Sequence, residues 1–148
     1  MESKILSSTG FLHQFSVEEL YVLTTHWQSD IVFFEQEINY FQSLITRYFL
    51  PNVEEQNVLL IKSISSHFEF LNNRKEQLKE NILEHQNRLS ILLDSSHVEN
   101  EAEFNVFHSD LEGKLFDFIK SLRQIKLEFF NATKFPGKTK PKVQKINF

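Results

Sequence analysis

The sequence predicts an all-α protein in which three long antiparallel helices form a coiled-coil-like bundle, with a short N-terminal cap and a flexible basic C-terminal tail. Apolar residues recur at alternating spacings of three and four along three long stretches, as in packed helices. Only three Gly and three Pro occur in 148 residues, too few for the turns of a sandwich, a barrel or a Rossmann-type fold. The 16 Phe side chains need buried surface, which packed helices supply.

The first helix is predicted to begin at a capping box. Ser16 lies three residues before Glu19, and Phe15 and Leu20 occupy the positions of a hydrophobic staple. No breaker follows until Pro51, which is expected to end the helix because proline lacks an amide donor. The apolar seam of this helix is Trp27, Ile31, Phe34, Ile38, Phe41, Ile45 and Tyr48.

The second helix is predicted to restart at once and to end near Asp94. Asn52 is a suitable N-cap residue and Glu55 stands three residues later. Such a short connection sends the second helix back antiparallel to the first. Its seam is Ile61, Ile64, Phe68, Leu71, Lys75, Leu78, Ile82, His85, Leu89 and Leu92.

The third helix is predicted to begin at another capping box and to end near Thr133. Ser96 and Glu99 have the Ser-x-x-Glu spacing, and Pro136 follows the end of the apolar pattern. The seam of this helix is Phe104, Phe107, Leu111, Leu115, Phe118, Leu122, Ile125, Phe129 and Ala132.

Charge divides the chain into a predicted bundle domain, 1–135, and a tail, 136–148. Residues 1–133 hold all 20 acidic residues and 11 of the 16 basic residues, a net charge of −9. The last 15 residues have a net charge of +5, and the tail lysines are Lys138, Lys140, Lys142 and Lys145. An acidic body repels phosphate, so nucleic acid is an unlikely partner. The tail is either a solvated segment or an adaptor to an anionic partner.

The two tight connections predict which residues share a layer. Straight helices reversing at Pro51 place Phe41 beside Ile61 and Leu20 beside Ile82. The end of the bundle near Pro51 is then rich in aromatic rings, which predicts a stable core there. The opposite end carries polar side chains on the seam and is expected to be less stable.

Polar seam residues leave a ligand- or metal-binding bundle open as an alternative. Lys75 either extends its ammonium outward, fixes the helix register, or borders a polar cavity. His85, His108 and Glu112 are the candidate metal ligands. The chain contains no Glu-x-x-His and no His-x-x-x-His, the spacings typical of metal sites in helical bundles. No cofactor is expected.

Catalysis is not predicted. The chain has no cysteine, no Gly-x-Ser-x-Gly nucleophile elbow, and too little glycine for a phosphate-binding loop. Paired carboxylates stand at predicted helix starts, where the helix dipole accounts for them. The N-terminal residues 1–15 lack the pattern of a signal peptide, and no apolar run reaches the ~20 residues of a membrane span. We expect a cytoplasmic protein.

Surplus aromatic residues outside the seams give the main functional hypothesis. Phe33 and Tyr40 lie seven residues apart beside the first seam, and Phe70 and Phe116 lie outside the second and third. They either widen the core or form an interface with a partner. The predicted function is a non-catalytic interaction or scaffold protein that binds a protein partner or a second copy through a helical face, with a homodimer as one form.

Overall fold

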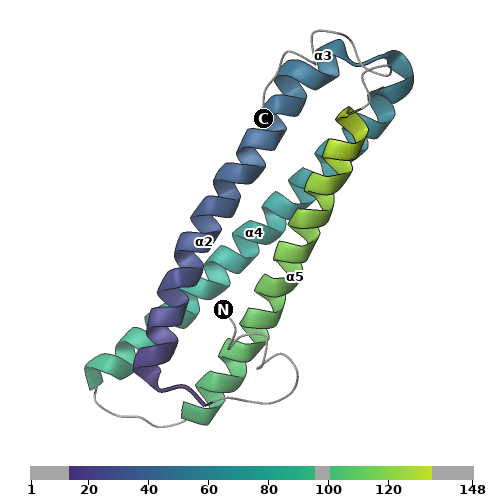
Figure 1. Cartoon of the computed structure of the whole chain (residues 1–148). Helices are drawn as coiled ribbons and strands as arrows, with labels where there is room; N and C mark the ends of the chain where they lie inside the picture. Colours follow the sequence, from purple (N-terminus) through teal and green to yellow (C-terminus); the bar gives the residue numbers. More distant parts are fainter. Residues whose placement is uncertain (1–13, 96–100, 135–148) are drawn as a thin grey trace. The chain divides into compact units, whose positions relative to one another are not determined.

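A computed structural model of the chain describes residues 14–95 and 101–134, and this described part is an all-α bundle of packed helices without strands (Figure 1). The predicted fold class is therefore confirmed. The predicted N-terminal cap lies almost entirely outside the described residues, as does the tail with its four lysines. The elements are α2 (Val17–Leu44), the π-helix η1 (Ile45–Phe49), α3 (Leu50–Asn52), α4 (Glu55–Ser95) and α5 (Glu101–Thr133).

Helix α2 begins with the predicted capping box. The Ser16 amide donates to Oε1 of Glu19 at 2.9 Å, and the Glu19 amide donates to Oγ of Ser16 at 3.2 Å. Phe15 packs against a small core cluster of Val17, Leu20 and Leu89, as a hydrophobic staple should. Local side-chain chemistry therefore fixed this helix start.

The prediction that Pro51 ends the first helix was wrong. The helix continues through η1, where the Leu50 amide bonds the carbonyl of Ile45 five residues back, and Pro51 lies in the first turn of α3. A proline is tolerated in the first turn of a helix because a backbone amide at that position would have no hydrogen-bond acceptor within the helix. The chain leaves the helix at Val53, which is extended (φ −83°, ψ 149°).

Asn52 does not cap the second helix, as the sequence had suggested. Its side-chain amide donates instead to the carbonyl of Tyr48 at 2.6 Å. This bond provides a partner for one of the backbone carbonyls at the end of the first helical stretch. Helix α4 starts at Glu55, and the Asn57 amide bonds the carbonyl of Glu54 at 2.8 Å.

The described residues fall into two compact units. Unit 1 comprises 14–33, 75–95 and 101–118, and unit 2 comprises 34–74 and 119–134. Helices α2, α4 and α5 each supply residues to both units.

The predicted register of the first two helices was wrong by two turns. In unit 2, Phe41 stacks on Phe68 with ring centroids 5.4 Å apart, not on Ile61. In unit 1, Leu20 packs with Leu89, not with Ile82. The π-helix and α3 extend the first helical stretch beyond the point where a simple proline break would end it, so each position meets a later residue of α4.

Candidate functional site

Polar side chains are buried in unit 1 but not in the described part of unit 2. Among residues 14–95 and 101–134, six polar or charged residues are less than 9% exposed, and every one of them belongs to unit 1. A buried polar group is stable only when it finds a hydrogen-bond or ionic partner, so such a cluster marks a specified arrangement. The six are Thr24, Lys75, His85, Asn105, His108 and Glu112.

Two histidines, His85 and His108, belong to this polar core. Nε2 of His85 and Nδ1 of His108 are 3.1 Å apart, so one ring donates a hydrogen bond and the other accepts it. Trp27 stacks on His108, with ring centroids 4.2 Å apart and an interplanar angle of 15°. The indole thus covers one face of the His108 ring.

The surroundings of His85 favour its neutral form. The Phe107 ring centroid lies 5.1 Å from that of His85, and Phe104 lies 6.4 Å away. Burial in this apolar setting, together with the positive charge of Arg88, lowers the pKa of His85 from 6.5 to about 4. Near pH 7 the ring is therefore uncharged.

The three candidate metal ligands all lie in this core. His85, His108 and Glu112 are each less than 9% exposed. The imidazole nitrogens that face each other are already engaged in a hydrogen bond. Within residues 14–95 and 101–134, no group of three or more His, Asp or Glu side chains is arranged to hold a metal ion.

Lys75 has its charged end inside the protein, in contrast to the outward extension proposed from the sequence. The residue is 1% exposed, and its Nζ lies 2.6 Å from Oε2 of Glu76. Glu76 itself is half exposed, so the ion pair joins the interior of unit 1 to its surface. Pairing of this kind is what allows an ammonium to be buried.

Asn105 is a buried anchor that the sequence reasoning missed. Its Oδ1 accepts from the Phe15 amide at 2.8 Å, and its Nδ2 donates to the carbonyls of Phe15 and Glu101, each at 2.9 Å. The seam of α5 had been drawn through Phe104 and Phe107, which are only half-buried. Spacings of three and four that include polar residues would have given Asn105, His108 and Glu112.

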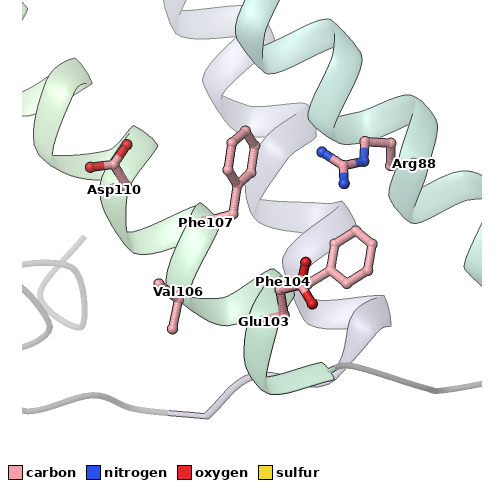
Figure 2. A pocket seen from close by; sticks show the side chains of 6 residues that line it. All are labelled: Arg88, Glu103, Phe104, Val106, Phe107 and Asp110. Carbon is pink, nitrogen blue, oxygen red and sulfur yellow. The ribbon is translucent and has the colours of Figure 1, made fainter.

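A pocket of about 390 Å³ opens beside the histidine pair in unit 1 (Figure 2). Figure 2 shows Arg88 extending from α4 towards two aromatic rings on α5. The guanidinium carbon of Arg88 lies 5.6 Å from the ring centroids of both Phe104 and Phe107, a cation–π distance. The lining residues are Arg88, Glu103, Phe104, Val106, Phe107 and Asp110.

All four aromatic residues proposed as partner contacts are exposed. Phe33 and Phe116 in unit 1, and Tyr40 and Phe70 in unit 2, are between 49% and 61% exposed. The explanation that these rings merely widen the core therefore does not describe them. Further exposed apolar residues, which the sequence reasoning did not single out, include Leu59, Leu60, Ile91, Val106 and Leu127.

A second groove, of about 430 Å³, lies on unit 2 between residues of α4 and α5. It includes Phe70, one of the four exposed rings, and basic side chains from both helices. Its lining residues are His67, Phe70, Leu71, Arg74, Lys120, Ser121, Gln124 and Ile125.

Comparison with known proteins gave no relatives. No family model, no curated protein and no solved structure matches this chain. Within the described residues, no helix is long and apolar enough to cross a membrane.

Proposed function

We propose that this protein is a non-catalytic interaction protein that binds a protein partner through exposed aromatic side chains on its helical faces. The observation that carries the proposal is the exposure of Phe33, Tyr40, Phe70 and Phe116, each between 49% and 61%. Burying one such ring in an interface is favourable by about 1.5–3 kcal/mol. Aromatic side chains are also enriched among the residues that dominate binding energies.

The antiparallel, coiled-coil-like arrangement and a homodimer belong to the same proposal. A bundle of three helices often completes its core by pairing with a second copy, and the exposed rings supply apolar area for that. A cytoplasmic setting is also part of it, since a chain without cysteine suits a reducing compartment.

Photo-crosslinking tests this function. A benzoylphenylalanine replaces Phe33, Tyr40, Phe70 or Phe116 in separate full-length variants expressed in cells, and Leu59, which is 79% exposed, provides the control position. We expect the aromatic positions to crosslink one defined protein, or a second copy of the chain, while the control position does not. Equal crosslinking at all five positions, or none at any, would contradict the proposal.

A small-ligand-binding bundle is the second candidate, and the pocket beside Arg88 is the observation that favours it. Its volume of about 390 Å³ falls within the range of ligand sites, and it combines two aromatic rings with a cationic and two anionic side chains. Native mass spectrometry of the gently purified protein tests this. A bound small molecule that is lost in Phe107→Ala would support it over the interaction function.

A further inference from the structure

We infer that the groove on unit 2 binds an acidic protein segment that carries an apolar anchor side chain. The inference rests on the proposed interaction function and specifies the partner's chemistry at one of its four aromatic positions. Phe70 and Arg74 lie one helical turn apart on α4, and Lys120 lies opposite them on α5. These three side chains bring one apolar contact and two positive charges to the same groove.

The charge of the groove is opposite to that of the chain. The groove lining contains Arg74, Lys120 and His67 and no Asp or Glu, whereas the whole chain has a net charge of −4. At the rim of the groove, Oε1 of Glu128 lies 3.7 Å from Nδ1 of His67. A local basic site on an acidic protein favours a partner with a few well-placed carboxylates.

Arg74 is the strongest single indication of an anionic partner. Its side chain is half-buried, and within the described residues its guanidinium has no hydrogen bond or ion pair. Partial burial removes water from a guanidinium and so costs it hydrogen bonds. A carboxylate that accepts two parallel hydrogen bonds from the guanidinium would replace them.

The apolar part of the site comes from Phe70 and the floor beneath it. Phe70 is 61% exposed, and within the described residues its ring contacts no other aromatic ring. Leu71 and Ile125 are buried core residues that also line the groove, so an anchor side chain entering it would meet apolar surface. An aliphatic or aromatic residue of the partner would fill this space beside Phe70.

A protein segment fits this groove better than a nucleic acid. Residues 1–133 have a net charge of −9, which repels a phosphate backbone along its length, while a short peptide presents only a few charges at the groove. The groove volume of about 430 Å³ accommodates a few side chains.

Peptide display tests the inference on the full chain. A random library of peptides about 12 residues long is selected on the wild-type protein and, in parallel, on the double variant Arg74→Glu with Lys120→Glu. We expect the wild type to enrich peptides with Asp or Glu beside an apolar residue. The double variant should bind those peptides at least about tenfold more weakly, and salt should weaken binding to the wild type.

Matched variants separate the groove from general surface effects. Arg123→Glu changes an exposed charge on α5 outside the groove and should leave peptide affinity unchanged, as should Leu59→Ser. Phe70→Ser should weaken binding about tenfold, and Arg74→Lys should retain part of the affinity because it keeps the charge without the fork. Circular dichroism checks that each variant keeps its helical content.

Three results would overturn the inference. They are selected peptides without acidic enrichment, equal binding to the double variant, or competition by a single-stranded oligonucleotide at lower concentration than by the peptides. The proposed function is tested independently of the groove. Crosslinking from Phe33, Tyr40 and Phe116 to a protein partner would support that function even if the selected peptides do not bind the groove.

Discussion

The two units are built from the same three helices, yet their cores are chemically different. In unit 2, Phe41 contacts three other phenylalanine rings, with centroids 5.3 to 5.8 Å apart, and Phe49 joins them through Phe129 at 5.1 Å. In unit 1, His85 and His108 contact each other and the rings of Phe15, Trp27, Phe104 and Phe107.

The difference shows how one helical pattern supports two kinds of core. Phenylalanine burial in unit 2 depends on area and shape, does not change with pH, and tolerates many arrangements of similar volume. The hydrogen bonds of unit 1 depend on distance, direction and protonation state, so they specify one arrangement and make it sensitive to conditions.

The largest loss is expected from emptying the ring cluster of unit 2. Phe129 is fully buried, and Phe129→Ala should reduce the free energy of unfolding by about 3–5 kcal/mol, since the lost ring leaves a cavity. Phe129→Leu, which retains most of the volume, should lose less than half of that. Urea unfolding followed by circular dichroism measures both. A loss below about 1.5 kcal/mol for the alanine variant would show that unit 2 does not depend on its rings.

Acid should destabilise the protein through the core of unit 1. The pKa of His85 is about 4 in the folded protein and 6.5 ordinarily, so between these values the unfolded chain binds a proton that the folded chain does not. The stabilisation is complete above pH 6.5 and is lost as the pH falls towards 4, by about 3 kcal/mol in total.

Urea unfolding between pH 7 and pH 4 measures this dependence. His85→Phe should flatten it, whereas His26→Gln, a change at an exposed position, should leave it intact. An unchanged pH dependence in His85→Phe would assign the acid sensitivity to other groups.

A smaller loss is expected when the Asn105 anchor is removed. Asn105→Ala deletes one accepted and two donated hydrogen bonds and leaves the Phe15 backbone without those partners. The free energy of unfolding should fall by about 2 kcal/mol. Amide hydrogen exchange should rise at Phe15, where the chain enters unit 1. The control Asn73→Ala, at an exposed position, should change neither quantity.

The smallest expected effect is a gain in stability from a substitution in unit 1. Gly113 lies within α5, and a Cβ atom placed there would meet no atom within 4 Å apart from its chain neighbours and the surrounding helix backbone. Gly113→Ala should therefore stabilise the protein by about 1 kcal/mol, because alanine loses less backbone entropy in a helix. Thermal unfolding measures the gain. A decrease in stability would mean that the glycine is needed for a helix distortion.

Signals within a few residues of one another could be read from the sequence. The capping box of Ser16 and Glu19 and the end of α5 at Thr133 were predicted correctly. The exposure of Phe33, Tyr40 and Phe70 is one of the two alternatives that the apolar pattern had left open. Helix caps and the repeat of 3.6 residues are local properties, so neighbouring residues determine them.

Contacts between distant residues could not be read in this way. Whether Phe41 contacts Ile61 or Phe68 depends on the π-helix before Pro51. No local sequence pattern predicted that π-helix. Asn105 and Arg74 look like ordinary polar helix residues in the sequence. Their surroundings come from other segments: the Phe15 backbone for Asn105, and α5 for the groove beside Arg74.

The sequence by itself determined an all-α fold, the start of its first helix and the end of its last, since these follow from short-range periodicity and capping. Only the tertiary structure decided that Asn105 bonds the Phe15 backbone in unit 1 and that basic side chains border Phe70 in unit 2. Both depend on helix register, and a shift of two turns changes every pair that crosses between helices.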